Sequence, residues 1–276
     1  MSPGRTLPSS ADKTTPPPLS LDIAGVRVSL DFPPGPFRER AVRRYSPFLT
    51  CRRPEYVLKT GFVPGRPRPF RPSLEEAGGE LKLRRGDFDC SLDLRRGRGR
   101  LELAPRVQAF DSFLRVLYSR LLPDRGGLLV HGACLEKGGR AYLFPGVSGA
   151  GKSTLSKLAA AAGKARVLSD ELAPVRLFGG RFYAYGSPFW GEMKPGREAR
   201  RYPLAGVYGL EKAREDGLLP AAHGALLRLL LRCAMNFSSG PAQAGSLLAL
   251  CARLSAEKGR GRFRFSKAGS GCLDLL

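Results

Sequence analysis

The sequence predicts an α/β protein with a P-loop nucleotide-binding core on a mixed sheet, preceded by a small, mostly-β region. Three observations predict this fold. Short alternating apolar segments fill the first part of the chain. A glycine-rich phosphate-binding motif near the middle lies between an apolar strand and a Leu/Ala-rich helix. Further strands and two helices follow this motif, as expected for an α/β core.

Changes in composition divide the chain into three parts. Residues 1–20 are rich in Pro, Ser, Thr and Gly, with almost nothing to bury, and are predicted to be a disordered tail. Residues 21–105 form the small, mostly-β region, and residues 106–276 form the P-loop domain together with a connecting helix. The β region holds these strand segments: apolar positions between Ile23 and Leu30, Tyr56–Leu58, Leu81–Leu83, Phe88–Leu94 and Leu101–Leu103.

The composition limits where the protein acts. The chain has 276 residues and 42% hydrophobic content, but no uncharged apolar run long enough to span a membrane and no signal-peptide core. We therefore expect a cytoplasmic protein without a membrane partner. Six cysteines without a C-x-x-C pair indicate free thiols, and with two histidines a Cys/His metal site is not expected.

The formal net charge of +22 is carried mostly by arginine, in clusters such as those at residues 38–44, 95–100 and 197–201. One interpretation is a surface for nucleic acid or another polyanion. The other is a solvated, arginine-biased surface that also attracts nucleotides. We favour the second and expect no nucleic-acid partner, because the clusters are dispersed and lack the aromatic interleaving of single-strand binders.

The central motif runs from Gly146 to Thr154 and matches the phosphate-binding pattern G-x-x-x-x-G-K-[ST] in full. Its glycines let successive backbone N–H groups approach phosphate oxygens, Lys152 reaches the β- and γ-phosphates, and Ser153 binds a magnesium ion. The motif predicts an ATP or GTP site. The predicted nucleotide-binding residues are Gly146, Ser148, Gly149, Ala150, Gly151, Lys152, Ser153 and Thr154.

The segments around the motif fit its chemistry. Arg140–Phe144 is predicted to be a strand and Ser153–Ala162 a helix that ends at Gly163, so the helix N-terminus faces the phosphates. A strand over Leu128–Leu135 joins the first through a tight turn. Two strands joined so closely are antiparallel, which makes the sheet mixed.

The remaining elements follow from periodicity and turn residues. An apolar stripe over Val107–Leu122, stopped by Pro123, predicts the connecting helix. After the motif we expect strands over residues 165–168, 175–178, 181–185 and 204–210, helices over residues 225–234 and 242–256, and a strand over residues 262–265. Gly179 and Gly180 predict a hairpin turn.

Asp170 and Glu171 follow the strand after the motif helix, at the sheet edge where α/β proteins bind ligands. One carboxylate can accept the proton of an attacking hydroxyl, and its neighbour can hold magnesium. The alternative is an exposed acidic turn. His131, in the strand paired with the one that enters the motif, either approaches the phosphates or orients the acidic pair. The alternative is a hydrogen-bonded structural residue.

An aromatic turn over Ser187–Glu192, which contains the single tryptophan, Trp190, precedes a second group of cations: Lys194, Arg197, Arg200 and Arg201. One of them can neutralise the transferred phosphoryl group or bind a substrate carboxylate. Alternatively, the turn is a packing corner followed by a solvated basic segment.

His131 and Gly132, the Gly146–Thr154 motif, and the Asp170–Glu171 pair together resemble the nucleotide core of HPr kinase/phosphorylase, a family related to phosphoenolpyruvate carboxykinases. The flanking segments look like divergent HPr-kinase-related proteins that occur with ribosomal peptide pathways. The resemblance implies that Asp170 is the general base, that Glu171 lies at magnesium, and that His131 lies close to the reacting phosphate. It also implies assembly into a homo-oligomer. The later glycine-rich signature of the family is not found, which argues against HPr itself as the acceptor.

The expected activity is an ATP- and Mg²⁺-dependent serine kinase that transfers the γ-phosphoryl group to a hydroxyl, most simply a serine of a peptide or small protein. Asp170, His131 and Lys152 are the predicted catalytic residues, and Ser153 and Glu171 the predicted magnesium ligands. One alternative is a small-molecule phosphotransferase acting on free serine or by carboxykinase-like chemistry. Another is a non-catalytic binding protein regulated by nucleotide.

Overall fold

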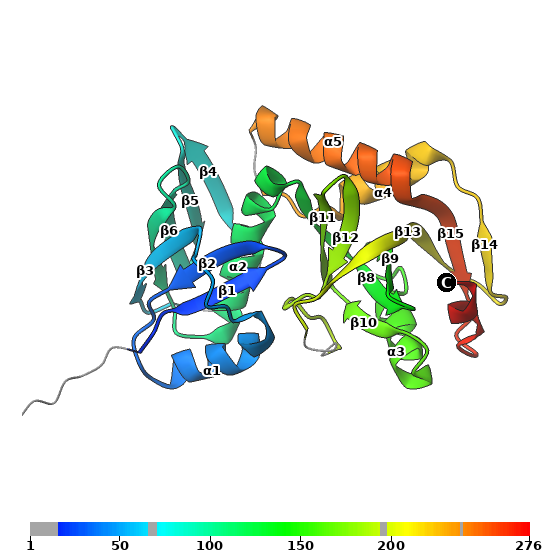
Figure 1. The fold of residues 1–276 in the computed structure, drawn as a ribbon, viewed down its shortest axis with the longest axis horizontal. Helices are drawn as coiled ribbons and strands as arrows, with labels where there is room; N and C mark the ends of the chain where they lie inside the picture. The colour runs from blue at the N-terminus through cyan, green and yellow to red at the C-terminus, as the bar shows by residue number, and fades with distance from the viewer. Residues whose placement is uncertain (1–15, 66–70, 194–197, 238–239) are drawn as a thin grey trace, which may run out of the picture.

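A computed structural model describes residues 16–65, 71–193, 198–237 and 240–276, and shows a mixed α/β protein with two mixed sheets (Figure 1). Its α-helices are α1 (Pro36–Tyr45), α2 (Val107–Leu121), α3 (Lys152–Ala162), α4 (His223–Cys233) and α5 (Pro241–Lys258). Its strands are β1 (Leu19–Ile23), β2 (Val26–Leu30), β3 (Tyr56–Phe62), β4 (Ser73–Ala77), β5 (Glu80–Arg85), β6 (Phe88–Asp93), β7 (Arg98–Leu103), β8 (Gly127–Lys137), β9 (Arg140–Pro145), β10 (Arg166–Ser169), β11 (Leu172–Phe178), β12 (Arg181–Tyr185), β13 (Arg201–Lys212), β14 (Gly217–Leu219) and β15 (Gly259–Phe265). Short 3₁₀ helices lie at Ser46–Phe48, Pro123–Arg125 and Gly271–Leu275.

The N-terminal region is built on a sheet whose strands, in the part of the chain described, follow the order β1-β2-β3-β7-β6-β5-β4. The pairs β2–β3 and β3–β7 are parallel and the other pairs are antiparallel. Alternate residues of these strands are buried, as in β5, where Leu81 and Leu83 face the core and their neighbours face outward. The prediction of a small, mostly-β region is confirmed.

Helix α2 covers the buried face of this sheet and lies between the two sheets (Figure 1). Its apolar stripe, which includes Phe110, Phe113 and Leu117, is fully buried in the same cluster as the N-terminal strands. Residues of the second sheet, Leu129 and Leu172, join that cluster as well. One continuous core therefore fixes the N-terminal region against the rest of the protein, and burial of this much apolar surface makes a loose linkage unfavourable.

The second sheet carries the central motif. In the described residues its strands follow the order β10-β8-β11-β12-β13-β15-β14, and β9 pairs with β8 and β13. The β8–β9 pair is antiparallel and the β9–β13 pair is parallel, so the predicted mixed sheet is confirmed. Helices α4 and α5 cover one face of this sheet and α3 covers the other (Figure 1). One apolar cluster lies under α4 and α5, and a second lies under α3.

Two N-terminal features differ from the sequence prediction. The predicted tail over residues 1–20 is wrong for its last two residues, because Leu19 and Ser20 pair with β2 and Leu19 is buried; residues 1–15 lie outside the described part. The arginine cluster at residues 38–44 lies on helix α1, which was not predicted. Its buried residues are Phe37, Ala41 and Tyr45, four residues apart.

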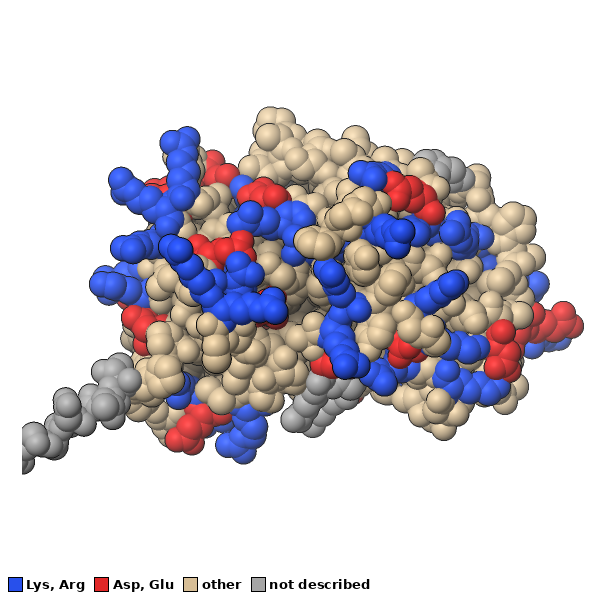
Figure 2. Space-filling model, viewed as in Figure 1, with Lys and Arg blue, Asp and Glu red and all other residues tan. Residues whose placement is uncertain are grey.

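The basic side chains are spread over the visible face of the molecule, with acidic side chains among them (Figure 2). Several cluster arginines have acidic neighbours; for example, Arg100 pairs with Glu102 at 2.7 Å. Among the described residues no helix has the length and apolar character needed to cross a membrane.

Candidate functional site

The Gly146–Thr154 segment leaves the sheet at the end of β9 and enters α3 at Lys152. The Gly146 N–H donates to the His131 carbonyl oxygen at 3.1 Å, which ties the start of the segment to β8. At its other end Gly151 caps α3 with a φ of 106°, in the left-handed region. A Cβ at Gly151 would lie 2.7 Å from the Phe265 ring. Glycine is therefore required there both by the backbone and by space.

A cleft of about 400 Å³ opens over this segment. All the predicted site residues line it except Gly146 and Ala150, and Gly191, Glu192 and Lys212 complete it. The predicted residues come from β8, the loop, α3 and the turn after β10. The fold therefore brings together residues that are up to forty positions apart in the sequence.

Two lysines lie at the loop. Lys152 is 8% exposed, and its Nζ donates to the Val147 carbonyl oxygen at 2.9 Å, across its own loop. Burial lowers the pKa of this ammonium group below its ordinary value. Lys212, at the end of β13, donates from Nζ to the Gly149 carbonyl oxygen at 2.8 Å. Two cations therefore converge on the loop, and both suit an anionic ligand.

Asp170 follows β10 and is 3% exposed. Its Oδ1 accepts the N–H of Gly191 at 2.9 Å and its Oδ2 accepts the N–H of Met193 at 2.7 Å. A Cβ at Gly191 would lie 3.0 Å from Asp170 Oδ2, so this close approach favours glycine. The two amides fix the carboxylate, whose oxygens have further lone pairs that can accept a proton or hydrogen bond.

The Gly191 amide belongs to the aromatic Ser187–Glu192 turn, and the Met193 amide directly follows this turn. The start of the turn is held by the Ser187 N–H, which donates to the Leu168 carbonyl oxygen at 3.2 Å. Phe189 is fully buried in the N-terminal core cluster, which anchors the turn. The turn is therefore both a packing corner and a wall of the cleft.

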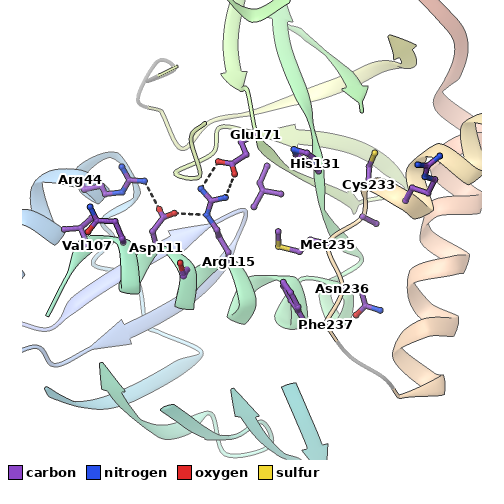
Figure 3. Close-up of a pocket in the computed structure, with 15 residues that line it drawn as sticks. Arg44, Val107, Asp111, Arg115, His131, Glu171, Cys233, Met235, Asn236 and Phe237 are labelled. Atoms are coloured by element: carbon purple, nitrogen blue, oxygen red, sulfur yellow. Dashed lines mark hydrogen bonds and ion pairs between the residues drawn. The ribbon is translucent and has the colours of Figure 1, made fainter. Parts of the chain in front are cut away.

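Glu171 is bound by an arginine from the N-terminal side of the molecule. Arg115 of α2 contacts Oε1 of Glu171 from Nη1 at 2.7 Å and Oε2 from Nη2 at 2.8 Å (Figure 3). Its Nε donates to Asp111 at 2.7 Å, and Asp111 also accepts a bond from Arg44 of α1. A line of alternating charges, Arg44, Asp111, Arg115 and Glu171, thus links α1 to the cleft (Figure 3).

His131 is half-buried on β8, opposite Leu172 of β11, and lines the cleft. Burial, and then the positive charge of Lys152, lower the pKa of the imidazole below its ordinary value of 6.5. Glu171 acts in the opposite direction but does not outweigh them. The side chain is therefore neutral at pH 7 and can donate or accept one hydrogen bond at the loop.

The cleft has oxygen donors that could bind a magnesium ion. No group of three or more His, Cys, Asp or Glu side chains with metal-binding geometry occurs in the described residues. Magnesium in phosphoryl-transfer sites needs no such group, because one or two protein oxygens combine with phosphate oxygens and waters. The Ser153 hydroxyl and the Glu171 carboxylate fit this requirement. Glu192, which lines the cleft and pairs with Lys157 at 2.6 Å, adds an oxygen donor at the rim.

Of the four candidate cations that follow the Ser187–Glu192 turn, the structure describes Arg200 and Arg201. Arg201 lies over the rings of Phe178 and Tyr183, at 4.7 and 4.8 Å, and neither Arg200 nor Arg201 lines the cleft. Lys194 and Arg197 lie outside the described residues. Arg115 and Lys212 contact the site instead. The sequence could have indicated Arg115, because Asp111 lies four residues before it on the same helix and such pairs form ion pairs. No local sequence pattern indicates Lys212.

No protein-family model matches this chain, and no curated protein matches it. Any inference about the function of the site must therefore come from its own residues and their geometry.

Proposed function

We propose that this protein is an ATP-dependent kinase that transfers the γ-phosphoryl group to a hydroxyl. The acceptor hydroxyl that we propose is that of a serine in a peptide or small protein. The proposal places a P-loop core of the HPr-kinase type around the 400 Å³ cleft. Its cytoplasmic location is part of the same proposal, since the described cysteines are free thiols.

The main support for the proposal is that a single cleft is lined by the glycine loop, Lys152 and the carboxylates of Asp170 and Glu171. A phosphate-binding loop alone would suit many nucleotide proteins. Asp170, buried and hydrogen-bonded to two amides, lines the same cleft as Lys152 and would serve there as the proton acceptor at the γ-phosphate. Loop, cation and base together favour phosphoryl transfer over nucleotide binding alone.

The chemistry follows from these positions. The acceptor hydroxyl attacks the γ-phosphorus, its proton passes to the Asp170 carboxylate, and a new P–O bond forms. The bond from the γ-phosphorus to the β,γ-bridging oxygen breaks, and its electron pair leaves with ADP. Lys152 and the loop amides stabilise charge on the phosphates, and Lys212 adds positive charge at Gly149. Most of the rate enhancement is expected from positioning and charge neutralisation.

Ser153 and Glu171 would hold Mg²⁺, which neutralises phosphate charge when it is bound. In the structure Arg115 binds both oxygens of Glu171 and so fixes the position of this carboxylate. His131, neutral at pH 7, lines the cleft from β8 and would hydrogen-bond a phosphate oxygen.

The test is transfer of label from γ-labelled ATP with magnesium to candidate peptides, comparing the native protein with Lys152→Ala and Asp170→Asn. We expect label on a peptide serine that is lost in both variants, while Asp170→Asn retains nucleotide affinity. Nucleotide binding that depends on Lys152, without transfer to any peptide or to free serine, would instead identify a nucleotide-regulated binding protein.

A further inference from the structure

A second, larger cleft of about 750 Å³ lies beside the nucleotide cleft. The two clefts share His131 and Glu171 in their linings. Three parts of the molecule form the walls of the second cleft: α2 from the N-terminal side, β8 and β11 of the second sheet, and the segment after α4 (Figure 3). It therefore opens directly onto the carboxylate and imidazole of the proposed kinase site.

The shared residues define which end of a nucleotide this cleft faces. In a P-loop the lysine reaches the β- and γ-phosphates, and the acidic residues act at the γ-phosphate. Glu171 and His131 are the residues common to both clefts, so the second cleft adjoins the γ-phosphate end of the loop. An attacking hydroxyl must approach from that end, in line with the bond that breaks.

The wall after α4 is fixed in place. Ala234 forms a β-bridge with Val130, and the Met235 N–H donates to the Leu129 carbonyl oxygen at 2.8 Å. Met235 and Phe237 give this wall an apolar surface, and Val107 contributes from α2 on the other side (Figure 3). A site of this kind binds apolar side chains of a ligand without first becoming ordered.

The charges of the cleft favour an anion. Three arginines and two carboxylates line it: Arg44, Arg115, Arg232, Asp111 and Glu171. The carboxylates bind Arg44 and Arg115, whereas Arg232, in the last turn of α4, is exposed and forms no ion pair with a described carboxylate. The buried Nε of Arg44 also has no hydrogen-bond partner among the described residues. One positive charge therefore remains at the mouth of the cleft.

We propose that this cleft is the acceptor site and that it takes a peptide segment in which the hydroxyl residue lies close to both an apolar and an acidic side chain. The proposal rests on the kinase function proposed above. A volume of about 750 Å³ is in the range that encloses a drug-sized ligand, far more than free serine requires. The acidic side chain pairs with Arg232, and the apolar one packs against Met235 and Phe237.

The probes are three blocked seven-residue peptides with a central serine, a leucine two positions before it, and glutamate, glutamine or lysine two positions after it. Trp190, the sole tryptophan, stacks under Arg44 of the cleft with 4.3 Å between the guanidinium carbon and the ring centroid. Its fluorescence reports peptide binding with or without nucleotide, and label transfer gives kcat and KM.

The variants are Arg232→Gln, the conservative Arg232→Lys, and Arg228→Gln as the matched control, one turn earlier on α4 and outside the cleft.

We expect the glutamate peptide to bind about three- to tenfold more tightly than the lysine peptide, the range of one solvent-exposed charged contact. Arg232→Gln should remove this preference through KM with kcat unchanged, Arg232→Lys should keep most of it, and Arg228→Gln should have no effect. Equal binding of the three peptides, or a preference that survives Arg232→Gln, overturns the proposal. So does the absence of any Trp190 response to a peptide. Failure of the kinase function would show separately, as peptide binding without transfer of label from γ-labelled ATP to any of the peptides.

Discussion

Arg115 and Glu171 form a two-point ion pair, with N–O distances of 2.7 and 2.8 Å, between a helix packed on the N-terminal sheet and the 400 Å³ cleft of the second sheet. The Arg115 side chain is 13% exposed, and Asp111 neutralises its remaining face. Such planar two-point pairs fix geometry more strictly than a single contact does. The N-terminal region therefore sets the position of a carboxylate in the site.

Replacing Arg115 with Met is expected to lower the free energy of unfolding by about 2–4 kcal/mol. The change leaves Asp111 without one partner and Glu171 without both of its contacts. We expect a smaller loss of unfolding free energy than for a fully buried ion pair, because the Glu171 side chain is 32% exposed. Urea unfolding measures the change, with Arg228→Gln as a surface control expected to stay within about 0.5 kcal/mol. A loss below about 1 kcal/mol would show that the pair is not structural.

Two loop glycines make a matched test of the loop geometry. Gly149 and Gly151 both have positive φ, at 83° and 106°, but only at Gly151 would a Cβ meet another residue. Gly149→Ala should cost about 1 kcal/mol from the backbone alone. Gly151→Ala should cost about 1–3 kcal/mol more and displace Phe265 or the start of α3. Thermal unfolding of the two variants measures the difference, and equal costs would contradict the described packing.

The sequence predicted the features that depend on local patterns. The glycine motif, the Gly179–Gly180 hairpin and the stripe of α2 each determine a turn or a face within about ten residues, and the structure has them. Helix α1 was missed because its many arginines obscured three buried positions four residues apart. That spacing, with Pro36 in the first turn, was a usable helix signal.

Site contacts that depend on tertiary packing could not be predicted. Arg115 contacts Glu171 across 56 positions of sequence, and Lys212 contacts Gly149 across 63. The amides that bind Asp170 lie in or directly after a turn whose place is set by the burial of Phe189. Residue types and spacings identify the loop and the acidic pair, but these partners depend on how the two sheets pack.

Asp170→Asn tests the predicted base together with its amide contacts. Asparagine keeps one acceptor oxygen but turns a donor NH₂ toward Gly191 or Met193, so a loss of about 1–3 kcal/mol in stability is expected. Phosphoryl transfer should fall by about 10²–10⁴-fold, because the hydroxyl proton loses its acceptor. Calorimetry should show ATP affinity changed by less than about threefold. Transfer that persists near the native rate would exclude Asp170 as the base.

His131 gives a pH signature. Its pKa in the folded protein lies below its ordinary value of 6.5, so the unfolded chain binds the proton more readily. Stability from the neutral imidazole is present above about pH 6.5 and is lost as the pH falls through the lowered folded pKa. Compared with His131→Gln, the native protein should therefore lose more unfolding free energy between about pH 7 and pH 5. Parallel curves for the two proteins would contradict this.

The most direct test of the nucleotide site is a calorimetric titration of the native protein with Mg-ATP, Mg-ADP and AMP. Since Lys152 and the loop amides act on the β- and γ-phosphates, ATP and ADP should bind at least about tenfold more tightly than AMP. Lys152→Ala should abolish this preference, whereas Lys164→Ala, a surface lysine paired with Asp274, should preserve it. Equal affinity for the three nucleotides, or a preference that survives Lys152→Ala, would contradict the proposed site.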